Sequence, residues 1–284
     1  MRISTLTPLL AALPTAYSAI TKPEINNTTA LPMHFGLLVF PGFQALDVFG
    51  PMDVFNSLAL LFKLPMTISI LSTTLDPVSS SVSGVMKNMS HGDFGEAVVP
   101  TDTFKNYLTR LSQTPLQVRH EGHEGHEEGI EEKKPCGHKK AETADIEVLI
   151  VPGGGGTRQP LLEEIDFVKA MYPKVKYILT VCTGATIAAR GGVLDGRRAT
   201  TNKMAWKWAT STGPNVTWVG HARWVDDGNI WTSSGVSAGS DMAYAWVASV
   251  YGEEVADYLS KAAEYNRWLD ANNDPFAAIH DVPA

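Results

Sequence analysis

One junction constrains the fold of this chain more than any other stretch: a short apolar run leads into Cys182, and small residues follow it. Residues 175–181 carry branched and aromatic side chains, which are typical of a buried β-strand, and residues 184–189 are small or β-branched, which predicts a closely packed helix. A cysteine at such a turn lies above the carboxyl edge of a sheet. There the free N–H groups of the helix favour a thiolate and can hold an oxyanion.

This junction alone leaves two interpretations of Cys182 open, a small core residue or a presented nucleophile. The only other cysteine, Cys136, lies in a very different, highly polar stretch. Two cysteines cannot form a disulfide framework, and we expect Cys182 to be a free thiol.

Strand-like and helix-like patterns alternate through most of the chain. We expect strands at 34–40, 66–72, 145–151 and 175–181, a hairpin at 222–235, and helices at 44–62 with an interruption at Gly50 and Pro51, at 160–171, from about 184, from near 240 and at 255–268. This order predicts an α/β fold with a largely parallel sheet and helices on both faces.

Two further features lie next to predicted strand ends. Asp47 stands among apolar residues just before Gly50 and Pro51, so it is either the cap of a helix that begins near Pro51 or a functional carboxylate. Four glycines, 153–156, follow the strand at 145–151 and let backbone N–H groups approach a ligand. The pattern matches neither a dinucleotide fingerprint nor a Walker loop, so an oxyanion wall is at least as plausible as a phosphate cradle.

Residues 118–143 differ sharply in composition from the rest of the chain. They hold many charges, few large apolar side chains, and five side chains that could bind zinc: His120, His123, His126, Cys136 and His138. Their spacing matches no closed structural zinc site. We therefore expect a solvated, flexible insertion and no metal.

Charge and hydropathy narrow the classes of partner. The formal charge is −7 and no basic stripe with interleaved aromatics occurs, so we expect no nucleic acid partner. No uninterrupted apolar run reaches about 18 residues, so we expect a soluble protein without a membrane span. Residues 1–19 resemble a secretory signal, and the sequons at Asn26, Asn27, Asn88 and Asn215 are compatible with a secreted glycoprotein; otherwise we expect a cytoplasmic one.

Five landmarks in order carry a resemblance to a known family: FPGFQALDVFGP, VLIVPGGGG, VCTGA, GVLDGRRATTN and ARWVDDGNIWTSSGVSAGSDMA. Together they resemble the ThiJ/PfpI superfamily, which is related to class I glutamine amidotransferases. The resemblance implies a flavodoxin-like three-layer sandwich at 34–270 with a cysteine nucleophile elbow, interrupted by the insertion at 118–143.

The resemblance also implies roles for individual residues. Cys182 matches the family nucleophile, Asp47 the acid that faces it, and Thr183 the neighbouring hydroxyl, while the backbone of Gly154 and Gly155 matches the pocket wall that binds substrate or oxyanion. Peptidase-like members carry a histidine directly after the cysteine, so a peptidase is not expected here.

Another departure is Asn202, which stands where many relatives carry a histidine. This departure removes one possible general base and leaves Asp47 as the main proton carrier.

Within the superfamily the chain is most similar to isonitrile hydratases, which add water to an isonitrile to give an N-substituted formamide. This implies a cofactor-independent enzyme, a small-molecule substrate and a homodimer. One alternative is a glyoxalase-type enzyme acting on 2-oxoaldehydes, with a histidine supplied by His221 or His91. The other is a redox sensor or ligand-binding protein in which Cys182 is oxidised without turnover.

Overall fold

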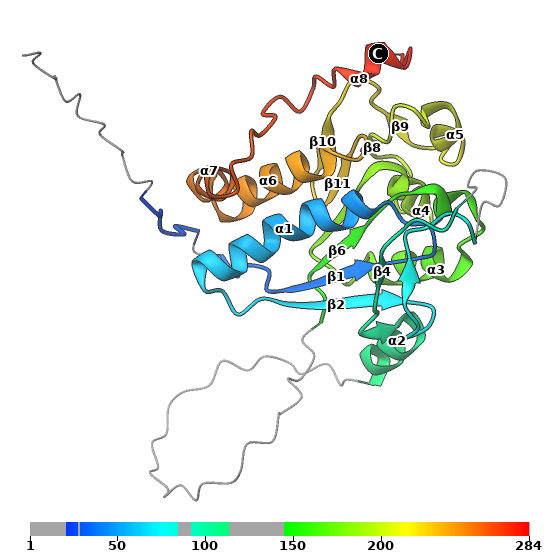
Figure 1. Ribbon diagram of the computed structural model, residues 1–284, viewed down its shortest axis with the longest axis horizontal. Coiled ribbons are helices and arrows are strands. Elements are labelled where there is room, and N and C mark those ends of the chain that lie inside the picture. The colour runs from blue at the N-terminus through cyan, green and yellow to red at the C-terminus, as the bar shows by residue number, and fades with distance from the viewer. Residues whose placement is uncertain (1–20, 28, 85–91, 114–144, 284) are drawn as a thin grey trace, which may run out of the picture.

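A seven-stranded sheet forms the centre of the protein (Figure 1). The computed structural model describes residues 21–27, 29–84, 92–113 and 145–283. The strands lie in the order β10 (Trp224–Asp227), β11 (Ile230–Ser233), β7 (Tyr177–Thr180), β6 (Val148–Val151), β1 (His34–Leu38), β2 (Thr67–Ser72) and β5 (Asp102–Thr103). Every neighbouring pair is parallel except β10 with β11. The predicted α/β fold with a mostly parallel sheet is confirmed.

Helices cover both faces of this sheet. On one side α1 (Ala45–Phe62), α6 (Ala238–Tyr251) and α7 (Glu253–Ala262) pack together, and on the other α2 (Phe104–Gln113), α3 (Leu162–Met171) and α4 (Ala185–Arg190) do so. The remaining elements are smaller: β3 (Val78–Ser79) with β4 (Ala97–Val98), β8 (Arg198–Ala199) with β9 (Thr217–Trp218), the 3-10 turns η1 (Gly155–Arg158) and η2 (Cys182–Gly184), α5 (Trp206–Ser211) and α8 (Phe276–Ile279).

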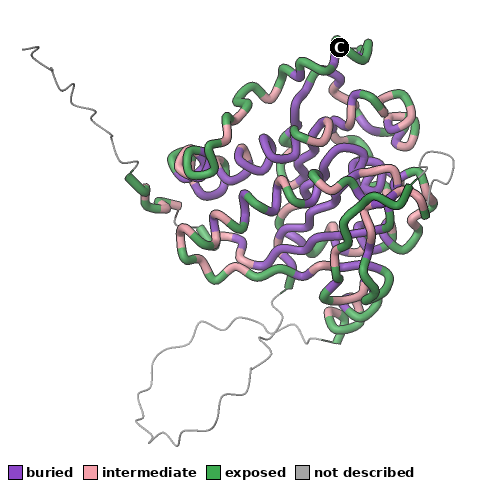
Figure 2. Tube along the Cα trace, in the orientation of Figure 1, coloured by how far each residue is buried: buried purple, intermediate pink, exposed green. Residues whose placement is uncertain are grey.

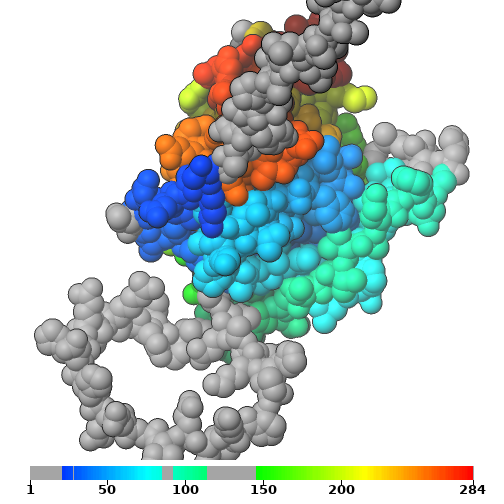
Figure 3. Space-filling view, turned by 60° about the vertical axis from the view of Figure 1, so that its left-hand side comes forward, coloured from blue at the N-terminus to red at the C-terminus, as the bar shows by residue number. Residues whose placement is uncertain are grey.

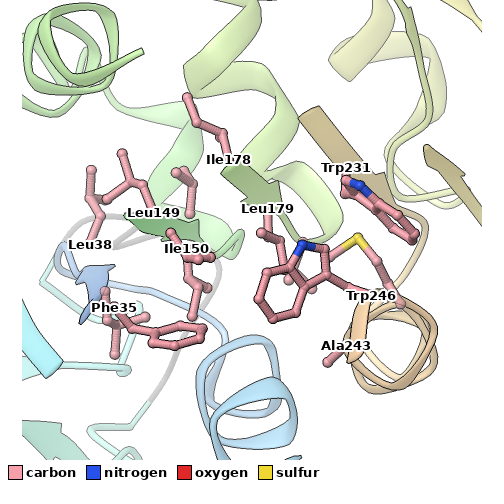
Figure 4. Packing of buried hydrophobic residues seen from close by; sticks show 14 of the residues in the cluster. Phe35, Leu38, Leu149, Ile150, Ile178, Leu179, Trp231, Ala243 and Trp246 are labelled. Atoms are coloured by element: carbon pink, nitrogen blue, oxygen red, sulfur yellow. The ribbon is translucent and has the colours of Figure 1, made fainter. Parts of the chain in front are cut away.

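The central strands are buried on both faces, as Figure 2 shows by their colour. Successive side chains point to opposite faces, so that Leu149 points towards one helix layer and Ile150 towards the other (Figure 4). On the side of α6, the ring of the fully buried Trp246 packs edge-on against two phenylalanine rings. The ring centroids lie 5.9 Å apart for Phe35 and 5.6 Å apart for Phe55. This aromatic cluster joins α6 and α1 to β1 and so fixes the helix that carries Asp47.

Helix α1 differs from the sequence prediction, because it begins at Ala45 and runs through Gly50 and Pro51. Pro51, the seventh residue of the helix, removes the N–H that would bond to the carbonyl of Asp47, and packing of α1 on α6 stabilises the helix despite this loss. A side chain at position 50 would place its Cβ 2.5 Å from Ser240 Oγ, so the glycine permits close packing on α6. Asp47 therefore lies in the first turn of the helix and is not its cap.

The same helix has the length and the mean hydropathy, 1.3, of a membrane span. It nevertheless buries Val48, Phe55 and Leu58 against the protein, and its single buried acid, Asp47, faces the interior. We interpret α1 as a core helix of the sandwich.

The chain after α7 also departs from the prediction of a helix at 255–268. Helix α7 ends at Ala262, and Glu264 adopts a left-handed φ of 51°, which terminates the helix. The following segment then crosses back along the β10 side of the molecule to α8 (Figure 1). It is tied there by hydrogen bonds from the Arg223 N–H to the Ala271 carbonyl, 2.7 Å, and from the Asp274 N–H to the His221 carbonyl, 2.7 Å.

Figure 3 shows the face of the molecule on which α1, in light blue, lies beside α6 and α7, in orange. The loops after β1 and β6 lie where the strand order changes direction, since β2 and β6 flank β1 on opposite sides. The carboxyl edge of a parallel sheet at such a point is the usual place for a ligand site. Cys182, which follows β7, lies at that edge.

Candidate active site

Cys182 occupies a strained turn between β7 and α4. Its φ is 58°, a left-handed conformation that costs an L-residue roughly 1–2 kcal/mol. The turn is closed by a hydrogen bond of 2.8 Å from the Gly184 N–H to the Val181 carbonyl. Only 4% of the residue is exposed, so the cysteine is buried at the sheet edge.

Asp47 reaches the same place from the first turn of α1 and is fully buried. Its Oδ2 accepts the backbone N–H of Gly153 at 2.9 Å, and the Gly153 carbonyl accepts the N–H of Gln44 at 2.8 Å. These two bonds join the loop after β6 to the start of α1. The carboxyl group therefore has a fixed position relative to the sulfur.

Burial sets the protonation of this acid. Removal from water raises the pKa of Asp47 from 3.8 to about 7, although hydrogen bonds from the Gly153 N–H and the Cys182 thiol oppose the rise. Apart from that thiol, its Oδ1 has no hydrogen-bond partner within the part of the chain that the structure describes. A carboxyl group with a pKa near 7 can both accept and donate a proton at neutral pH.

The surroundings also raise the pKa of the Cys182 thiol. Burial, and next the negative charge of Asp47, raise the pKa of Cys182 well above its ordinary value. Hydrogen bonds from the backbone of Thr183, the Asn202 amide and the Thr183 side chain lower it in part. The resting sulfur is therefore a thiol, and Asp47 is the nearby group that can take its proton.

Thr183 supports this geometry through its hydroxyl group. Its Oγ1 accepts the Gly154 N–H at 3.0 Å and lies 3.0 Å from Thr157 Oγ1. A side chain at Gly153 would bring its Cβ to 2.6 Å from Thr183 Oγ1 and 2.9 Å from Asp47 Oδ2, so only glycine fits between them.

The two glycines expected to form the oxyanion wall lie beside this network. The Gly154 N–H is engaged by Thr183, and Gly155 begins η1. Their binding of a substrate oxyanion stays a prediction, as do the catalytic roles of Cys182, Asp47 and Thr183, although the structure brings these last three residues together.

Sequence reasoning missed the direct contact of Asn202 with the nucleophile. Its Nδ2 lies 3.2 Å from Cys182 Sγ, while its Oδ1 accepts the Ala205 N–H at 2.9 Å, which assigns the amide orientation. The preceding Thr201 donates its hydroxyl to the Cys182 carbonyl at 2.9 Å. The one available signal is a polar residue three positions after the short strand β8, where the sequence indicates only the absence of a histidine.

The histidines that the structure describes lie elsewhere. His221 bonds to the Val282 carbonyl at 3.2 Å, and His34 lies at the amino end of β1 beside Ser69. His91, the region 1–19, the insertion 118–143 with its possible zinc ligands, and Asn88 lie outside the described residues. Within the described part, no three histidine, cysteine or acidic side chains form a metal site.

Two curated proteins are similar to this chain in sequence. The chain is 26% identical over 238 residues to an isonitrile hydratase from Pseudomonas putida, covering 83% of this chain and 79% of that protein. It is 34% identical to a deglycase from Pyrococcus abyssi over 105 residues, covering 36% of this chain and 59% of that protein.

Solved structures share the fold. A ThiJ/PfpI family protein from Pseudomonas syringae superposes with a TM-score of 0.58 at 24% identity, covering 93% of this chain and 84% of that one. Drosophila melanogaster DJ-1beta superposes with a TM-score of 0.57 at 15% identity, covering 83% of this chain and 100% of that one. The model of the DJ-1/PfpI family matches residues 35–249. The chain thus belongs to the DJ-1/PfpI family.

Proposed function

We propose that this protein hydrates an isonitrile to an N-substituted formamide, with Cys182 as the nucleophile and Asp47 as the proton carrier. The observation that carries the proposal is the pairing of a nearly buried thiol with a buried carboxyl group whose pKa is about 7. Such a pair can deliver a nucleophile and a proton to one carbon in the absence of water.

The chemistry follows from the positions of the two groups. Asp47 takes the thiol proton, the sulfur bonds to the terminal isonitrile carbon, and Asp47 returns the proton to that carbon, giving a thioimidate, R–N=CH–S–Cys. Water then adds to the same carbon, and its protons pass to the nitrogen and back to sulfur. The carbon–sulfur bond breaks, which releases R–NH–CHO and the free thiol.

The burial of the sulfur suits this substrate class. With 4% of Cys182 and 6% of Thr183 exposed, a slender linear group such as –N≡C can reach the sulfur more easily than a branched carbonyl or a peptide. Thr183 and Asn202 contribute hydrogen bonds that lower the pKa of the thiol. The isonitrile hydratase of Pseudomonas putida, similar over most of both chains, supports the same choice.

A second candidate is a carbonyl reaction of the glyoxalase or deglycase type, which the relative from Pyrococcus abyssi favours. The glyoxalase reaction was expected to use a histidine from His221 or His91. In the structure His221 is bonded to the C-terminal segment through Val282, and the side chains that contact Cys182 are Asp47, Thr183 and Asn202. These contacts favour the isonitrile reaction.

The test is a panel of purified proteins and substrates. The parent, Cys182→Ala and Asp47→Asn are each incubated with alkyl and aryl isonitriles and, separately, with methylglyoxal, and the formamide or lactate is quantified. We expect formamide from the parent, none from Cys182→Ala, and a rate lower by roughly 10²–10⁴ from Asp47→Asn. Lactate without formamide would replace the proposal by the glyoxalase reaction. No product, together with peroxide oxidation of Cys182 detected by mass spectrometry, would replace it by a sensor role.

A further inference from the structure

We infer that Asp274, in the segment that follows α7, is a positioning residue: through its charge on Lys203 it holds the Asn202 amide against the Cys182 sulfur. This rests on the proposed role of Cys182 as the nucleophile. It adds a distant part of the chain to the site, since Asp274 comes from the segment that returns from α7 to α8.

Lys203 is buried, with 3% of its surface exposed. Its Nζ donates to Thr200 Oγ1 at 2.7 Å and to the Ala222 carbonyl at 2.8 Å, and it lies 3.9 Å from Asp274 Oδ2. Two of the three ammonium donors are used by these acceptors, and the carboxylate supplies the nearest negative charge. Asp274 Oδ2 has no hydrogen bond within the described structure, so its interaction with Lys203 is one of charge.

A buried lysine depends on such a counter-charge. Burial lowers the pKa of Lys203 to about 8, with Asp274 opposing this effect and the neighbouring Arg223 adding to it. Without Asp274 the ammonium would be buried beside another cation, which disfavours both the charge and the position of the side chain.

Lys203 belongs to the short segment that holds Asn202. On one side Thr201 bonds to the Cys182 carbonyl, and on the other the Ala205 N–H orients the Asn202 amide. Lys203 anchors this segment to the carbonyl of Ala222. A shift of a few tenths of an ångström here would lengthen the 3.2 Å contact between Asn202 and the sulfur.

A neighbouring ion pair offers a matched control. Asp241 is also buried and ties down the same C-terminal segment, because it accepts hydrogen bonds from Arg223 at 2.7 Å, the Tyr265 hydroxyl at 2.8 Å and the Trp268 N–H at 3.0 Å. Within the described structure Asp241 has no hydrogen bond or ion pair with residues 200–205. Arg223 pairs with both Asp241 and Asp274, so Asp241→Asn loosens the C-terminal segment and the shared arginine while the contact of Asp274 with Lys203 stays in place.

The experiment reads the thiol directly and needs no turnover. In a Cys136→Ser background Cys182 is the only thiol, and its rate of alkylation by iodoacetamide is measured against pH. Asn202→Ala should raise the thiol pKa and slow alkylation at pH 8 about three- to tenfold, the effect of one lost hydrogen bond. Asp274→Asn should also slow the alkylation of Cys182. In the double variant with Asn202→Ala, the alkylation rate should equal that of Asn202→Ala alone.

Asp241→Asn should lower the melting temperature but leave the alkylation profile unchanged. If Asp274→Asn fails to fold, the neutral pair Lys203→Met with Asp274→Leu replaces it, with the same slow alkylation expected.

The inference is overturned if Asp274→Asn alkylates at the parental rate, if it slows alkylation equally in the Asn202→Ala background, or if Asp241→Asn has the same effect. Failure of the parent to hydrate isonitriles would overturn the proposed function and leave this coupling measurable.

Discussion

Asp47 accepts the backbone N–H of Gly153 at 2.9 Å, so the glycine loop after β6 holds the acid that faces the nucleophile. The bond satisfies one carboxyl oxygen and leaves the other towards the site, without a partner in the described structure beyond the thiol. The protein keeps an acid in a place where an ionised carboxylate is poorly solvated. Ionisation of Asp47 therefore lowers the free energy of unfolding, and this decrease can be measured against pH.

The first prediction concerns stability. The pKa of Asp47 is about 7 in the folded protein against 3.8 in the unfolded chain. Between about pH 4 and pH 7 the unfolded chain releases this proton while the folded protein keeps it, so folding stability falls as the pH rises through that window. The loss is complete above pH 7 and amounts to about 4 kcal/mol at most.

Asp47→Asn cannot ionise and should therefore melt at a higher temperature than the parent at pH 8, with the difference shrinking towards pH 4. Thermal unfolding followed by circular dichroism checks this. Asp53→Asn, an exposed acid on the same helix, is the control and should show no such trend. An Asp47→Asn protein that is less stable than the parent at pH 8 would contradict the assignment.

The second prediction concerns the pH dependence of turnover. The reactive form of the pair carries one proton shared between Cys182 and Asp47, and below the pKa of Asp47 both groups are protonated. We expect kcat/KM for isonitrile hydration to rise as the pH increases through about 7. In Asp47→Asn this rise should disappear, and the rate should fall by roughly 10²–10⁴. A profile that is flat from pH 5 to pH 8 in the parent would speak against Asp47 as the proton carrier.

The third prediction tests the strain at the elbow. With φ at 58°, Cys182→Ala retains the unfavourable backbone conformation, whereas Cys182→Gly relieves it. Both variants should be inactive, and the glycine variant should be more stable than the alanine variant by roughly 1 kcal/mol in denaturant unfolding. Equal or reversed stabilities would show that the turn stores no strain.

The sequence predicted the strand, the cysteine and the helix at this elbow because all three are local. The run 175–181 becomes β7 and its exit turn, and α4 begins three residues after Cys182. The mostly parallel sheet followed from the same alternation of patterns. The partnership of Asp47 with Cys182 came from the family resemblance, since 135 residues separate them and spacing alone cannot bring them together.

Other features needed the structure because they depend on tertiary contacts. Pro51 suggested a helix start, yet packing of α1 on α6 carries the helix past it. Asn202 looked like a lost base, and only the positions of Ala205 and the sulfur show its amide as a donor. The helical pattern after Ala262 is likewise overridden, because Tyr265 and Trp268 donate hydrogen bonds to the buried Asp241, and Asp274 pairs with Arg223 further along the segment.

The last prediction separates the hydroxyl of Thr183 from its methyl group. Thr183→Ser retains the acceptor for the Gly154 N–H and the contact with Thr157, whereas Thr183→Val keeps the shape and leaves that partly buried N–H without its acceptor. We expect Thr183→Val to lose about 1–3 kcal/mol of stability and most of the turnover, because the loop that holds Asp47 through Gly153 relaxes with it. Thr183→Ser should stay close to the parent in both respects, as measured by denaturant unfolding and formamide formation. If valine were tolerated as well as serine, the hydroxyl would have no part in the site, and the family match at this position would reflect packing of the methyl group alone.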